Sequence, residues 1–98
     1  MKVYLKIHRR NDIDTVACCD ETLLNHIFTE GNLRIEINSN FFEGDLLSID
    51  QALEILKGAS YFNIVGENIT NKAIDLQLLS KNGVTKINNI PMSINMMF

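Results

Sequence analysis

The stretch SIDQALEILKGASYFNIVGE, residues 48–67, decides how this chain folds. Ser48 and Gln51 have the spacing of a capping box, and apolar residues follow at helical intervals, so we predict a helix that ends at Gly58. Residues 61–65 form a short, nearly unbroken apolar run, which is typical of a strand in the interior of a sheet. A helix that leads into a buried strand indicates that helices pack on a sheet.

Apolar periodicity predicts the elements on both sides of this stretch. Alternation indicates strands, helical spacing indicates helices, and Gly or Asn at a boundary indicates a turn. Pro91 cannot donate a hydrogen bond to a sheet, so we expect it at a sheet edge or a bulge. The further predicted elements are strands over 3–8 and 13–18, a helix from Asp20 to Gly31, a strand over 33–37, a polar loop over 38–47, a helix from Gly66 to about Leu79, and a closing hairpin of strands 84–87 and 92–98 around Asn88-Asn89.

The resulting order, ββαβαβαββ, predicts an α+β protein. We expect a two-layer α/β sandwich in which three helices pack on a mixed sheet of about six strands. The 98 residues suffice for one α+β domain, 1–98, with a core that needs neither disulfides nor metal. We expect one core to bury the apolar side chains Leu5, Ile7, Ile35, Leu53, Leu56, Ile64 and Val65.

Charge is segregated along the chain. The first ten residues carry four bases and no acid, whereas residues 11–54 carry ten acids against one base. Tyr4 lies between two lysines on one face of the first predicted strand, and RNA-binding sheets combine rings and phosphate-seeking charges in this way. A strand face that is merely solvated is the alternative. The RNA- or phosphate-binding residues that we predict are Lys2, Tyr4, Lys6, Arg9 and Arg10.

No residue pattern indicates catalysis or a metal site. The acids that follow the adjacent Cys18 and Cys19 are Asp20 and Glu21, which should raise a thiol pKa rather than lower it. Neither the cysteines nor the histidines have the spacing of zinc ligands. We therefore predict no catalytic residue, no metal, no cofactor and no enzymatic activity. Without a disulfide framework or an apolar run of about 18 residues, a cytoplasmic protein with no membrane partner is expected.

The turn after the strand over 61–65 permits a second interpretation. A helix N-terminus offers free backbone N–H groups to an anion. Gly66, Glu67 and Asn68 would then bind the anion, and the protein would be a small-ligand or anion-binding domain with at most a minor enzymatic activity. A single glycine matches neither a dinucleotide-binding nor a P-loop fingerprint, so a tight strand-to-helix turn explains the same pattern.

Four apolar residues lie outside the predicted core positions. Phe41 and Phe42 are adjacent aromatics in a polar loop, where both side chains rarely reach one core. Ile74 and Leu78 form a second apolar stripe on the third predicted helix. We predict that these four residues contact a partner, with burial through irregular local structure as the alternative.

Four motifs together resemble an archaeal family that is catalogued as domain of unknown function 424. In chain order they are VACCDE at 16–21, EGNL at 30–33, FFEG at 41–44 and NIVGE at 63–67. The resemblance covers essentially the whole chain, and the Val-Gly-Glu turn is its most specific part. It implies a compact two-layer α/β sandwich from an archaeal cytoplasm and transfers no catalytic residue. Relatives often have His after the proline of the final hairpin, where this chain has Met92, which favours a structural or binding role.

The resemblance also implies a cellular setting, because genes of the family tend to lie beside genes for translation factors or ribosome maturation. Together with the basic strand, it predicts a non-enzymatic accessory protein of the archaeal translation machinery, ribosomal or ribosome-associated. Ribosomal RNA or ribosomal proteins are then the expected partners. A net charge of −3 is unfavourable for autonomous nucleic-acid binding, so we expect no DNA partner. The oligomeric state stays open.

Overall fold

A mixed six-stranded sheet, in the order β5-β1-β2-β6-β8-β7, organises residues 1–95, which are the residues that the computed structural model describes. Strands β2 and β6 are parallel, and the other neighbouring strands pair antiparallel. The α+β class and the mixed sheet of about six strands with three helices are confirmed, although one of the three helices is not where it was predicted. The strands are β1 (Lys2–Arg10), β2 (Ile13–Asp20), β5 (Asp45–Ser48), β6 (Tyr61–Val65), β7 (Thr85–Ile87) and β8 (Ile90–Asn95).

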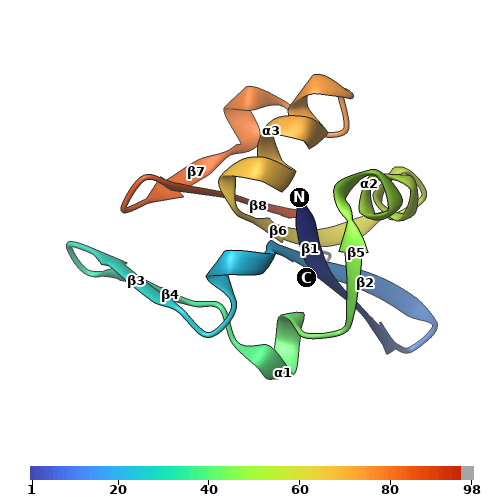
Figure 1. Ribbon diagram of the computed structural model, residues 1–98, viewed down its shortest axis with the longest axis horizontal. Helices are drawn as coiled ribbons and strands as arrows, with labels where there is room; N and C mark the ends of the chain where they lie inside the picture. Colours follow the sequence, from blue (N-terminus) through green and yellow to red (C-terminus); the bar gives the residue numbers. More distant parts are fainter. Residues whose placement is uncertain (96–98) are drawn as a thin grey trace.

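Two helices, α2 (Ile49–Lys57) and α3 (Glu67–Asp75), cover one face of the sheet, which we call the helix face (Figure 1). The predicted capping box of α2 is present. Ser48 Oγ accepts a hydrogen bond from the backbone N–H of Gln51 at 3.2 Å, and Gln51 Oε1 accepts one from the backbone N–H of Ser48 at 3.1 Å. The strand side chains buried in the helix-face core are Val3, Leu5, Val16, Cys18, Phe62 and Ile64.

The opposite face, which we call the second face, is covered in part by smaller elements (Figure 1). They enclose a separate core of Ala17, Cys19, Ile37, Phe42 and Val65. The predicted polar loop over 38–47 is therefore partly regular, because it contains α1 and β5. The elements on the second face are the 3-10 turn η1 (Glu21–Leu23), the hairpin of β3 (Ile27–Glu30) and β4 (Leu33–Glu36), and the one-turn helix α1 (Ser39–Phe42).

The prediction of a single core is wrong. Successive strand residues point to opposite faces, so Val65 packs on the second face while its neighbour Ile64 packs on the helix face. Ile35 is partly buried against the second-face core, and Leu5 belongs to the helix-face core. Ile7 is 51% exposed, because it lies near the end of β1 where the helix-face packing stops.

The predicted helix from Asp20 to Gly31 is also wrong. Asn25 has a positive φ of 68°, which interrupts any helix, and its backbone N–H donates to Ile37 O at 2.7 Å. Gly31, at φ 59°, then begins the two-residue turn between β3 and β4. The sequence carries a signal for this hairpin, because β-branched and aromatic residues at 27–29 precede Gly31-Asn32 and alternation resumes at Leu33.

The third helix ends four residues earlier than predicted, at Asp75. Gln77 adopts a positive φ of 61°, and its N–H donates to Ile74 O at 2.9 Å. The next N–H, of Leu78, donates to Ala73 O at 2.9 Å, which completes a Schellman motif. This reversal turns Leu78 back onto the helix-face core.

The closing hairpin has the predicted turn, since Asn88 and Asn89 have φ values of 51° and 64°. The expectation for Pro91 is wrong, because β8 lies between β6 and β7 without a bulge in the register. Pro91 O accepts from the N–H of Gly66 at 2.9 Å, so the proline nitrogen points past the end of β6 and interrupts no ladder bond. Residues 96–98 of the predicted last strand lie outside the described residues.

Candidate functional site

The carboxyl ends of the parallel strands β2 and β6 form a closed polar junction. Their register pairs Cys19 with Val65, so Asp20 lies next to the start of α3. The two carboxylate oxygens of Asp20 accept the backbone N–H groups of Asn68 at 2.9 Å and Ile69 at 3.0 Å. The predicted anion position at Gly66, Glu67 and Asn68 therefore already holds an anion, which is a side chain of this protein.

The absence of a side chain at Gly66 leaves room for the Asp20 carboxylate. The Gly66 φ of 123° is accessible to glycine and strained for other residues, and an added Cβ would lie 2.6 Å from Asp20 Oδ2. Burial raises the pKa of the Asp20 carboxyl, the N–H groups of Asn68 and Ile69 lower it, and Glu67 raises it, with a net upward shift. Asp20 is 5% exposed, so an external anion would have to displace a buried internal one. The sequence prediction missed this role because it placed Asp20 at the start of its own helix.

The adjacent thiols are both buried and free. Cys18 points into the helix-face core and Cys19 into the second-face core. Burial, and to a smaller extent the neighbouring Asp20, raise the pKa of Cys19 to about 12, and burial likewise raises the pKa of Cys18 far above its ordinary value. The predicted effect of Asp20 on the thiol pKa is confirmed in direction, although burial is the larger cause.

The opposite end of β1 and β2 is open. The hairpin that joins these strands projects from the sheet (right side of Figure 1), and a hollow of about 660 Å³ lies against it. This hollow, which we call the hairpin groove, unites three segments that are distant in sequence: the β1–β2 hairpin, α1 and the start of β6. Its lining residues are Ile7, His8, Arg9, Arg10, Asn11, Ile13, Thr15, Phe41 and Tyr61.

Contacts from β1 hold α1 at the wall of the hairpin groove. The His8 ring stacks on the Phe41 ring with centroids 4.6 Å apart and planes 16° apart. His8 Nε2 lies 2.7 Å from Phe41 O, so this nitrogen donates the hydrogen bond. Lys6 Nζ donates to Asn40 O at 2.9 Å. Sequence reasoning did not place His8 in the site, and its contact with Phe41 spans 33 residues.

The structure gathers some of the five predicted phosphate-binding residues and separates others. Arg9 and Arg10 both line the hairpin groove, whereas Lys2 is exposed at the other end of β1. Tyr4 is partly buried against the second-face core. Arg9 Nε binds Asp14 Oδ1 at 3.0 Å, an exposed pair that holds the guanidinium weakly. Arg10 is exposed and makes no ion pair with any residue from 1 to 95.

The four predicted partner-contact residues have different positions. Phe42 is 5% exposed in the second-face core, so its predicted contact with a partner is wrong, whereas Leu78 is partly buried against the helix-face core. The two adjacent rings reach one core region because they meet edge to face at 5.0 Å. Phe41 is partly buried and lines the hairpin groove, and Ile74 is half-buried on α3.

Neither a metal cluster nor a membrane span is found in the part of the chain that the structure describes. Within residues 1–95, no three side chains of His, Cys, Asp or Glu lie close enough together to hold a metal ion. In the same range, no helix has the length and apolar character that crossing a membrane requires. The cytoplasmic location stays a prediction.

Comparison with known proteins supports the fold and names no activity. A family model described as "Protein of unknown function (DUF424)" matches residues 8–97. The crystal structure of an uncharacterized conserved protein from Methanopyrus kandleri is similar, with a TM-score of 0.80 and 21% sequence identity over 100% of this chain and 96% of that chain. No curated protein matches.

Proposed function

Since this chain belongs to the DUF424 family, whose description names no activity, we propose its function from its geometry: it is a non-enzymatic, RNA-binding accessory protein of the archaeal translation machinery. The hairpin groove is the proposed RNA site. One observation carries the proposal. The groove brings Arg9 and Arg10 to the same hollow as Phe41 and Tyr61, and Arg10 makes no ion pair among residues 1–95.

This combination suits single-stranded RNA. Guanidinium groups bind phosphates, and aromatic rings stack on bases that are not already stacked in a duplex. An acidic protein needs a local basic surface for such binding, and the acids of this hairpin, Asp12 and Asp14, do not line the hairpin groove. The resemblance associates relatives with translation genes, so ribosomal RNA is the RNA that we propose.

Fluorescence anisotropy with a labelled single-stranded RNA of about 12 nucleotides tests the site directly, a length within the ~4–16 nucleotides that single-strand binding modules cover. The double variant Arg9→Gln/Arg10→Gln should bind more weakly, and its salt slope should fall by somewhat less than one unit, about 0.7 for a single strand, for each phosphate that the protein no longer neutralises. The matched control is Lys81→Gln/Lys86→Gln, which removes the same charge from exposed residues outside the groove. Equal weakening in both variants would mean that net charge, not the groove, sets the affinity.

Sedimentation tests the translation setting separately. Native protein in a cell lysate should travel with ribosomal particles on a gradient and leave them as salt rises, because phosphate binding is salt-dependent. The Arg9→Gln/Arg10→Gln variant should leave at lower salt. Protein that stays at the top of the gradient at every salt concentration contradicts the translation role, even if the anisotropy experiment shows RNA binding.

A further inference from the structure

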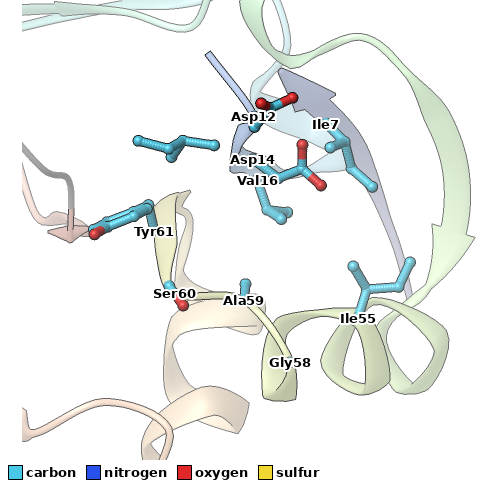
Figure 2. A pocket seen from close by; sticks show the side chains of 10 residues that line it. Ile7, Asp12, Asp14, Val16, Ile55, Gly58, Ala59, Ser60 and Tyr61 are labelled. Carbon is cyan, nitrogen blue, oxygen red and sulfur yellow. The ribbon is translucent and has the colours of Figure 1, made fainter. Parts of the chain in front are cut away.

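We propose that the helix-face side of the β1–β2 hairpin binds a basic, apolar-anchored segment of a partner protein. A second hollow, of about 370 Å³, lies on this side between the hairpin, the end of α2 and the start of β6. Figure 2 shows Asp12 and Asp14 on one side of this hollow, with Ile55 of α2 and Ala59 of the following loop on the other. We call it the acidic hollow.

Two isoleucines at the acidic hollow are exposed, although the other apolar residues of the same strand row or helix are buried. Ile7 continues the β1 row of Val3 and Leu5 yet is 51% exposed. Ile55 is 37% exposed on α2, whose other apolar residues are buried. Covering both side chains would remove apolar surface from water, which favours an apolar anchor as the occupant.

The charges at the acidic hollow indicate which polar residues the bound segment should carry beside its apolar anchor. Its lining contains the carboxylates of Asp12 and Asp14 and no lysine or arginine. Asp14 is paired with Arg9, whereas Asp12 makes no ion pair with any residue from 1 to 95. These carboxylates repel RNA and attract a Lys or Arg next to the apolar anchor. The complementary partner is therefore a protein segment with adjacent apolar and basic residues.

This inference does not rest on RNA binding. The acidic hollow and the hairpin groove share Ile7, Ile13 and Tyr61, and the Arg9–Asp14 pair joins them, but each also has residues of its own. Arg10 and Phe41 line the groove alone, and Asp12, Asp14 and Ile55 line the hollow alone. Variants at residues that line one hollow alone, such as Arg10 or Ile55, can therefore remove one function and leave the other. The hairpin would hold RNA on one side and a protein segment on the other.

A selection from a random peptide library displayed on phage tests the proposal. Enriched peptides should carry Lys or Arg beside Leu, Ile, Met or Phe, and they should bind the Ile7→Ser/Ile55→Ser variant at least about tenfold more weakly. Asp12→Asn/Asp14→Asn should weaken the same peptides and lower their salt dependence. The matched control Leu46→Ser, an exposed site on β5, should leave binding unchanged.

Thermal unfolding checks that the variants are folded, and all of these positions are exposed enough for that to be expected. Enriched peptides without a basic–apolar pairing, or peptides that bind the Ile7→Ser/Ile55→Ser variant equally well, would overturn the proposal. So would self-association of the wild-type chain in sedimentation equilibrium that the double variant abolishes, because a second copy of the chain would then be the occupant.

Discussion

The two ends of the central strands β1, β2 and β6 differ in how their polar groups are satisfied. At the carboxyl end of β2 and β6, the buried Asp20 carboxylate binds the first turn of α3, and Gly66 provides the space. At the other end, Arg10 and Asp12 project from an open hairpin without ion pairs among residues 1–95. The closed end pairs its polar groups internally, whereas the open end leaves charges and apolar surface exposed.

This difference separates an end whose polar groups stabilise the fold from an end whose charged groups are exposed to solvent. A Gly-turn-helix start is a common anion site, and the sequence made it a candidate here. In the folded chain this helix start has a structural role, because the backbone N–H groups of Asn68 and Ile69 donate to Asp20, which lies 48 and 49 positions away in the sequence. We therefore expect substitutions at the closed end to act on stability, and those at the open end to act on binding.

The largest effect is expected for Gly66→Ala. The added Cβ meets the Asp20 carboxyl group, and alanine does not favour a φ of 123°. Backbone strain of about 1–3 kcal/mol would add to the disturbed cap, so we expect a loss of about 3 kcal/mol or more in the free energy of unfolding. Urea denaturation measures it. Gly31→Ala, which keeps a positive φ but has nothing within 4 Å of the new Cβ, is the matched control and should cost less.

A smaller effect is expected for Asp20→Asn. One oxygen of the amide can still accept an N–H, but the NH2 group cannot, so a buried donor of Asn68 or Ile69 loses its partner. An unsatisfied buried group costs about 1–3 kcal/mol. Asp14→Asn makes the same chemical change in the exposed Arg9 pair at the open end and should cost at most about 1 kcal/mol. Equal losses at the two sites would contradict the distinction between the ends.

The closed end also shows which parts of the fold the sequence could predict. Helix α2 and strand β6 were correctly predicted because a capping box and an apolar run are local signals. The Asp20 cap was not, because its partners lie on another element and no local pattern links them. The same limit applies at the open end. Arg9 and Arg10 could be proposed from local charge, but the His8–Phe41 contact depends on how α1 folds onto the sheet.

Titration of Asp20 should change the stability of the closed end with pH. Burial raises the pKa of this carboxyl in the folded protein above its ordinary value of 3.8, so the folded state binds the proton more readily than the unfolded state does. Its contribution to stability therefore rises as pH falls from the raised folded pKa to the ordinary one, and it is lost as pH rises through that window. In urea denaturation between about pH 7 and pH 4, wild type should gain stability relative to Asp20→Asn on acidification. The opposite trend would show that the two N–H bonds outweigh burial.

The smallest effect on stability is expected at the open end, for Arg9→Gln/Arg10→Gln. Arg9 loses an exposed ion pair and Arg10 loses no ion pair that the structure describes, so the free energy of unfolding should change by about 0.5 kcal/mol or less. The same variant should lose RNA affinity, as argued for the hairpin groove. A loss of about 2 kcal/mol or more in urea denaturation would mean that these arginines maintain the fold. The contrast between a closed structural end and an open binding end would then fail, because weaker binding could no longer be separated from unfolding.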